Sequence, residues 1–300
     1  MPARLIELLE RSGPLTGAEI HASLGGEAFD AWKACRLSPR LALRRVGRRY
    51  LRIDRRVDGY ARLSPSILRE FMTYTVVGVS SDPAALEERA RAARAHVREV
   101  SRRKLELATR LITDIVARVG TEPGDEEAFC VALAGDIVYE MAHDVNRPER
   151  STGLMVQGSD LDIVVLVSDA SSALPARLDR AIYAEKHRYL KHPAFREEID
   201  YVVKGFDRLR EQARFDTVQR MVACKVFDEA VLLCGSEALF AAGKALLRDC
   251  GVVDRLRAME QSAIAARQRD EDHLLTADAE SLRRDGYPAF RSGDEAEEFA

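Results

Sequence analysis

The sequence lacks any long hydrophobic run. Its densest apolar stretch is Ile163 to Val167, far short of the roughly 20 residues that cross a bilayer. The opening segment, MPARLIELLERSG, places charged residues among apolar ones, as an amphipathic helix does, and has no apolar core of a signal peptide. We therefore expect no membrane partner.

Paired cysteines are also missing. The chain has five cysteines, an odd number, and no CxxC pair or Cys/His cluster occurs among them. A disulfide framework and a structural zinc site are therefore not indicated, and a reducing cytoplasm is the expected location. The Walker A, HExxH, GxSxG and GxGxxG motifs are absent as well, so the sequence gives no indication of the chemistry that each of them carries.

Net charge and aromatic content are both low. Lys and Arg number 46 against 49 Asp and Glu, which leaves a formal charge of −3 and excludes a uniformly basic nucleic-acid coat. Aromatic residues make up 6% of the chain, whereas hydrophobic residues make up 46%. A globular protein with an aliphatic core, divided into two or three units, is the expectation for 300 residues.

The N-terminal sixty residues have the pattern of three short helices followed by a hairpin. The helices are expected within residues 3–13, 15–26 and 27–39, with Thr16 as an N-cap. Residues 41–54 alternate around Gly47, which predicts a β-hairpin or wing. This order is that of a winged-helix-like domain, although a generic small domain can have the same pattern.

Arginine is concentrated in the same domain. Between Arg36 and Arg56 there are nine arginines and one acid, Asp54. Clustered arginines release condensed counterions when they bind phosphates, so the segment is a candidate nucleic-acid interface. A solvated basic face, paired with acids of the same protein, explains the cluster equally well. The candidate nucleic-acid-binding residues are Arg44, Arg45, Arg48 and Arg49.

The rest of the chain predicts an α+β protein. A long helix is expected after Asp82-Pro83, and strands are expected near 126–136, 161–169 and 197–206, with a helix between the last two. These elements form an α/β core. The expected domains are an Arg-rich winged-helix-like domain (1–66), a linker strand and long helix (67–119), the core (120–240), and a helical C-terminal region with an acidic tail (241–300).

The chemically informative segment is GSDLDIVVLV, Gly158 to Val167. Asp160 and Asp162 stand two residues apart at the start of a strand, so both carboxylates point to one face. They would repel each other unless a cation lies between them, and hard oxygen ligands favour Mg²⁺ or Mn²⁺. Asp200 on the next predicted strand would complete a triad if the two strands are neighbours, and such a triad can hold two metal ions. A solvated turn before a buried strand is the alternative.

This segment resembles the metal-binding strand of the DNA polymerase beta-like nucleotidyltransferase superfamily. The resemblance covers about residues 126–206 and implies a mixed sheet flanked by helices. It implies that Asp160 and Asp162 are paired metal ligands, and that Asp200 completes the metal site and activates the attacking hydroxyl. The cofactor implied is Mg²⁺ or Mn²⁺, and the substrate is an NTP.

The family's phosphate-binding Gly-Ser turn corresponds here to Gly135-Asp136. Asp136 would face phosphate with a negative charge unless it turns away or helps to coordinate metal. The interval before Asp160 is longer than usual, so HDVNRPERSTGLMVQ forms an inserted loop or hairpin, in which Arg147 could reach phosphate. A second alignment places the phosphate turn at Gly158-Ser159.

The expected function is transfer of NMP from an NTP to an acceptor hydroxyl, with release of pyrophosphate. The Arg-rich domain favours an RNA 3′ end as the acceptor, and a protein or small molecule is also open. Two alternatives remain: a winged-helix nucleic-acid-binding regulator with an inactive, nucleotide-sensing core, and a complex subunit that docks an acidic partner. The oligomeric state and the preferred base cannot be derived from the sequence.

Overall fold

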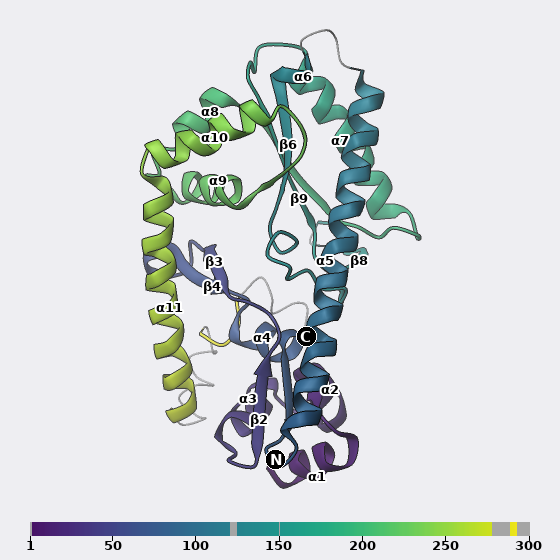
Figure 1. Ribbon diagram of the computed structural model, residues 1–300, viewed down its shortest axis with the longest axis vertical. Helices are drawn as coiled ribbons and strands as arrows, with labels where there is room; N and C mark the ends of the chain where they lie inside the picture. Colours follow the sequence, from purple (N-terminus) through teal and green to yellow (C-terminus); the bar gives the residue numbers. More distant parts are fainter. Residues whose placement is uncertain (1, 121–124, 150, 278–288, 293–300) are drawn as a thin grey trace. The chain divides into compact units, whose positions relative to one another are not determined.

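The computed structural model describes residues 2–120, 125–149, 151–277 and 289–292, except the side chain of Glu126 (Figure 1). The chain forms two compact units, and neither is continuous in sequence. The first contains the residues up to Arg52, then 62–98 and those from Glu260 onward, whereas the second contains 53–61 and 99–259.

The first unit begins with three helices. The elements up to Val79 are α1 (Pro2–Ser12), β1 (Leu15–Thr16), α2 (Gly17–Leu24), α3 (Ala28–Leu37), β2 (Leu41–Arg45), β3 (Tyr50–Ile53), a 3₁₀ turn (Asp58–Tyr60), β4 (Ala61–Ser64), α4 (Ile67–Tyr74) and β5 (Thr75–Val79). The 3₁₀ turn, with the last residue of β3 and the first of β4, belongs to the second unit. The predicted N-cap is confirmed, because the Thr16 side chain accepts a hydrogen bond from the Glu19 N–H and Glu19 bonds back to the Thr16 N–H.

The predicted hairpin between residues 41 and 54 is wrong in its pairing. Both strands form, but β2 pairs antiparallel with β5, in a sheet of order β1-β5-β2, and β3 pairs with β4. The β5 strand is apolar, and its Val76 and Val77 are fully buried. It therefore offers β2 a better partner than the Arg-rich segment that follows Gly47.

The C-terminal segment adds to the core of this unit. Phe290 is 3% exposed, and its ring packs against the rings of Phe29 and Trp32 on α3, 5.2 and 5.5 Å between centroids. Its carbonyl oxygen accepts a hydrogen bond from the Leu68 N–H. Of the expected C-terminal region with its acidic tail, residues 278–288 and 293–300 lie outside the described residues.

Two long helices, α5 (Pro83–Val119) and α11 (Val252–Thr276), contribute residues to both units. The other elements of the second unit are α6 (Asp125–Ala128), β6 (Phe129–Ala134), β7 (Asn146–Pro148), β8 (Met155–Gln157), β9 (Leu161–Val167), α7 (Leu174–Lys191), β10 (Ile199–Gly205), α8 (Phe206–Gln212), α9 (Val218–Glu229), β11 (Val231–Gly235) and α10 (Glu237–Asp249). The predicted order of strand, strand, helix and strand is confirmed.

The sheet of the second unit is mixed and has the order β10-β9-β6-β11. Strand β10 is parallel to β9, whereas the β9–β6 and β6–β11 pairs are antiparallel. One face packs on α5 and α7 through the odd-numbered side chains of β9, from Leu161 to Val167. Near β6 the opposite face is covered by α9 and α10, where small alanines meet Val226 and Phe240.

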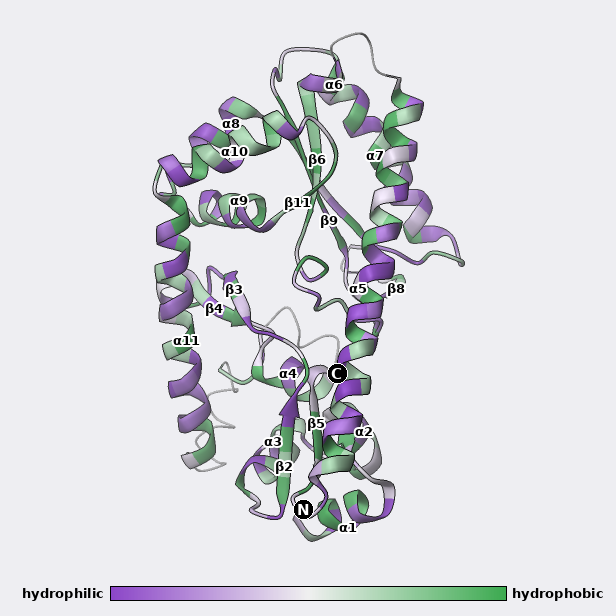
Figure 2. Ribbon diagram, in the orientation of Figure 1, coloured by the Kyte–Doolittle hydropathy of each residue, from purple (hydrophilic) through white to green (hydrophobic). Residues whose placement is uncertain are grey.

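Hydropathy follows this layering. Figure 2 shows β6 as hydrophobic along its length, whereas α5 and α11 alternate between hydrophilic and hydrophobic residues. Among the described residues, none of the helices combines the length and the hydrophobicity that a membrane crossing needs.

A buried ion network links distant segments of the first unit. The Arg49 guanidinium donates two hydrogen bonds to Glu70, at 2.6 and 2.7 Å, and a third to Glu271 at 2.5 Å. Arg267 also bonds to Glu271, at 2.9 Å, and its Nη1 donates to the carbonyl of Pro65. Burial acts to raise the pKa of Glu70, but these guanidinium groups outweigh it and leave the pKa below its usual range.

The lowered pKa of Glu70 predicts that the protein loses folding stability at acid pH. A carboxyl whose pKa is lowered on folding stabilises the protein above its unfolded pKa, about 4.5, and that stability is lost as pH falls through the folded pKa. Glu70→Gln should therefore lower stability at pH 7 by about 3 kcal/mol, as breaking a buried pair does, and make the melting temperature less dependent on pH below 4.5. Thermal denaturation of the full chain measures both effects.

The matched control is Glu10→Gln, which removes the exposed Arg40–Glu10 pair. Exposed pairs contribute little, so its melting temperature should stay close to that of the wild type. Equal effects of the two substitutions would contradict the role assigned to Glu70.

Candidate functional site

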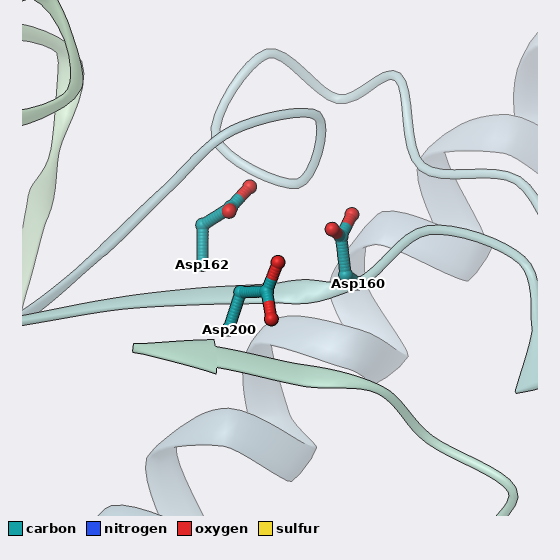
Figure 3. A group of neighbouring side chains, drawn as sticks. All are labelled: Asp160, Asp162 and Asp200. Atoms are coloured by element: carbon teal, nitrogen blue, oxygen red, sulfur yellow. The ribbon is translucent and has the colours of Figure 1, made fainter. Parts of the chain in front are cut away.

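Strands β9 and β10 bring two aspartates side by side. In the parallel register Asp200 lies opposite Asp162, although the two residues are far apart in sequence. Asp160 immediately precedes β9, and one carboxylate oxygen from each of the three residues lies within 4.8 Å of the others. Figure 3 shows the three carboxylates gathered on one side of the two strands. The predicted convergence of the triad is confirmed, and the roles of its members stay predictions.

The local sequence explains why Asp162 faces this site. Side chains alternate along a strand, and the odd-numbered residues of β9 are aliphatic and buried under α5 and α7. Asp162, at an even position, must then point to the opposite face. The Leu161 N–H donates to the carbonyl of Glu198 at 2.9 Å, which aligns the start of β9 with the segment before β10.

The turn after β6 closes against Asp162. Gly135 has a φ of +77°, and a Cβ added there would lie 2.0 Å from Oδ2 of Asp162, so any other residue would be strained and would displace that carboxylate. Its N–H donates to Oε1 of Glu229 at 3.1 Å, and the other carboxylate oxygen of Glu229 accepts from the Tyr139 hydroxyl at 2.5 Å. The N–H that the family resemblance assigns to phosphate therefore already has a protein partner.

Asp136 and Ser159 contact each other. The Ser159 hydroxyl donates to Oδ2 of Asp136 at 3.1 Å and accepts from the His143 N–H at 3.2 Å. Ser159 is 3% exposed, and its own N–H donates to the carbonyl of His143. The Gly158 N–H donates to the carbonyl of Val145. These contacts do not favour a phosphate turn at Gly158-Ser159, and the nucleotide-binding assignment of Gly135, Asp136, Gly158 and Ser159 stays a prediction.

Two charged groups from outside the motif reach the triad. Arg147 of β7 lies with Nη2 3.9 Å from Oδ1 of Asp160 and with Nη1 2.8 Å from Oε2 of Glu198. Burial raises the pKa of Glu198; Arg147 acts in the opposite direction, and the charges of Asp160 and Asp200 add to the rise. From the sequence, Arg147 is expected to reach phosphate. Glu198 is not predicted from the sequence, although strand alternation from Asp200 could have indicated it.

Lysine also contributes to the charge balance of the site. Lys186 of α7 lies with Nζ 3.0 Å from Oδ1 of Asp200. Lys204 shares the face of Asp200 on β10 but is four residues further on, where its Nζ donates to Oε1 of Gln212 at 2.9 Å. Burial lowers the pKa of Lys204 to about 8. Lys204 therefore contacts Gln212 of α8 and Phe227 of α9, and not the aspartate triad.

The four candidate nucleic-acid-binding arginines do not form one surface. Arg44 and Arg45 are neighbours on β2 and point to opposite faces, toward Glu87 at 3.5 Å and Glu70 at 4.0 Å respectively. Arg49 is held by the Glu70 and Glu271 carboxylates, and Arg48 is exposed. For Arg49 the contacts favour pairing with acids of the same protein.

Comparisons with protein-family models, curated proteins and solved structures found no match to the chain. The family suggested by the Gly158–Val167 motif therefore stays a prediction, carried by the geometry of the triad.

Gly135→Ala tests whether the turn after β6 sets the position of Asp162. The new methyl group would displace the Asp162 carboxylate, and we expect Mn²⁺ affinity, measured by calorimetry on the full chain, to fall at least tenfold, about 1.4 kcal/mol. Gly153→Ala is the matched control, because Gly153 has a similar φ of +70° with no atom within 4 Å of an added Cβ. Equal Mn²⁺ affinities in the two variants would contradict the proposed contact.

Proposed function

We propose that this protein is a metal-dependent nucleotidyltransferase that moves NMP from an NTP to an acceptor hydroxyl. The observation that carries the proposal is the triad itself. Asp160 and Asp162 stand two residues apart at the start of β9, and Asp200 lies directly opposite Asp162 on the parallel neighbour β10. The mixed sheet, with helices on both faces, supports the same assignment.

The donor set fits a divalent cation. Three carboxylates within 4.8 Å of one another repel when all are ionised, and a hard cation removes that repulsion. Oxygen-only ligands favour Mg²⁺ or Mn²⁺ over softer metals. When bound, the ion or ions supply charge neutralisation to the triphosphate and to the departing pyrophosphate.

Asp200 then has a different role from Asp160 and Asp162. Asp160 and Asp162 hold the cation. Asp200, half exposed at the edge strand, completes the metal site, orients the acceptor hydroxyl and accepts its proton. The acceptor oxygen forms a bond to the α-phosphorus as the bond to the bridging oxygen breaks, and pyrophosphate leaves. Lys186 holds one oxygen of Asp200, which fixes the direction of the other. Most of the rate enhancement comes from positioning and charge neutralisation.

The first unit supports nucleic acid as the acceptor. Its order of helix, strand, two helices and strand, with β5 between β1 and β2, supports the proposed winged helix. In such domains the third helix reads the groove. Here the Lys33 ammonium of α3 donates to the carbonyl of Ala277, and Arg36 lies 3.6 Å from Glu271. Contacts through β2 and the segment after it therefore fit an RNA 3′ end better than base reading by α3.

A nucleic-acid-binding regulator with an inactive core is the second candidate. It is favoured by the protein partners of the Gly135 turn, because the Gly135 N–H that would hold triphosphate donates to Glu229 instead. This candidate predicts binding to duplex DNA that weakens steeply with salt, and no nucleotide turnover.

The deciding experiment is transfer of label from α-labelled NTPs, supplied singly with Mg²⁺ or Mn²⁺, to total RNA or lysate protein. The Asp160→Asn/Asp162→Asn variant should lose at least a hundredfold in transfer rate, because no ligand pair remains to hold the cation; this loss corresponds to about 2.7 kcal/mol. Asp254→Asn, which changes an exposed aspartate on α11, is the matched control and should retain full activity. A double variant that keeps more than one hundredth of the wild-type transfer rate would contradict the proposal, as would no label with the wild type.

A further inference from the structure

A buried guanidinium group lies beside the triad. The side chain of Arg147 is 11% exposed and makes one hydrogen bond to the backbone and two ion-pair contacts. Its Nε donates to the carbonyl of Gly158 at 2.9 Å, Nη1 lies 2.8 Å from Glu198, and Nη2 lies 3.9 Å from Asp160. Arg147 thereby contacts the segment before β9 and the segment before β10.

Glu198 is a fourth carboxylate at the site. It precedes Asp200 by two residues, so strand alternation places both side chains on the same face. The backbone bond from the Leu161 N–H to the Glu198 carbonyl brings it next to Asp160 as well. Among the described residues, Arg147 supplies the one cationic side chain with which Glu198 pairs.

We propose that Arg147 is a positioning residue that holds Glu198 away from the cation and fixes the direction of Asp160. The site then binds a divalent ion through three carboxylates and not through four. This inference rests on the proposed function only in its assumption that the triad binds a divalent cation.

The inserted β7–β8 hairpin places Arg147 between Asp160 and Glu198. Arg147 is the central residue of β7 and pairs in register with Val156 on β8. The base of the hairpin is anchored by Lys104 of α5, whose Nζ donates to the carbonyl of Gln157 at 2.8 Å and to Glu197 at 2.6 Å. Each of the adjacent glutamates, 197 and 198, is thus neutralised by its own cation from a different element.

Arginine suits this position better than lysine. Its planar guanidinium presents donors in several fixed directions, so one side chain reaches a backbone carbonyl and two carboxylates at once. A lysine ammonium is a single point charge on a flexible stem. It would neutralise Glu198 without fixing Asp160.

The test is Mn²⁺ binding by calorimetry and electron paramagnetic resonance on the full chain. In Arg147→Met, Glu198 is released toward the cation, and we expect Mn²⁺ affinity to rise at least tenfold while label transfer falls. In Glu198→Gln, Arg147 is left without its partner, and the added positive charge should lower Mn²⁺ affinity severalfold. The double variant Arg147→Met/Glu198→Gln should return to within about threefold of the wild type, since the net charge is restored.

A rise in Mn²⁺ affinity for Arg147→Met and a fall for Glu198→Gln distinguish this role from a merely structural one. A structural role would lower the Mn²⁺ affinity of both variants. Arg147→Lys should keep the wild-type Mn²⁺ affinity and lose transfer rate. Arg118→Met, which removes an exposed guanidinium paired with Glu185, is the matched control and should change nothing.

Unchanged or weaker Mn²⁺ binding by folded Arg147→Met would overturn the proposal, as would a wild type that binds no Mn²⁺. If Arg147→Met does not fold, a double variant that binds Mn²⁺ outside the threefold range overturns it equally. The expected Mn²⁺ pattern without any label transfer would support this inference and reject the proposed function, so the two failures are distinguishable.

Discussion

The candidate site of the second unit depends on holding three carboxylates together against their mutual repulsion. Hydrogen bonding in the parallel pair β9–β10 fixes Asp162 opposite Asp200, and the buried aliphatic face of β9 prevents either strand from turning these side chains away. The cations around the site compensate part of the charge. Lys186 pairs with Asp200, Arg147 lies near Asp160, and Asp162 lies against the Gly135 turn.

Pairing between opposite charges also stabilises the first unit. Its arginines could have formed a solvent-facing basic surface, yet several contact carboxylates of the same unit, and the Glu70 side chain gathers Arg49 and Arg267. Charge in this unit therefore contributes to folding as well as to any partner that it binds. Its α3 contacts Glu271 of α11 and the carbonyl of Ala277, so the proposed nucleic-acid contacts would be made to the backbone through the strands more than to bases through α3.

Periodicity was sufficient to predict β9, β10 and the helix between them, and the two-residue spacing of Asp160 and Asp162 was sufficient to predict their common face. Periodicity could not predict the contacts between segments that are distant in the sequence. The pairing of β2 with β5 is decided by the burial of Val76 and Val77, which only the assembled core determines. Glu229 reaches Gly135 from a helix almost a hundred residues later, and no local pattern indicates such a contact.

The most direct test of the central claim is a crystal structure of the protein with Mn²⁺ and a non-hydrolysable NTP analogue. We expect an anomalous manganese peak between the carboxylates of Asp160 and Asp162, with the triphosphate on the same side of β9 and β10. A manganese peak elsewhere, or a nucleotide bound away from these strands, would contradict it.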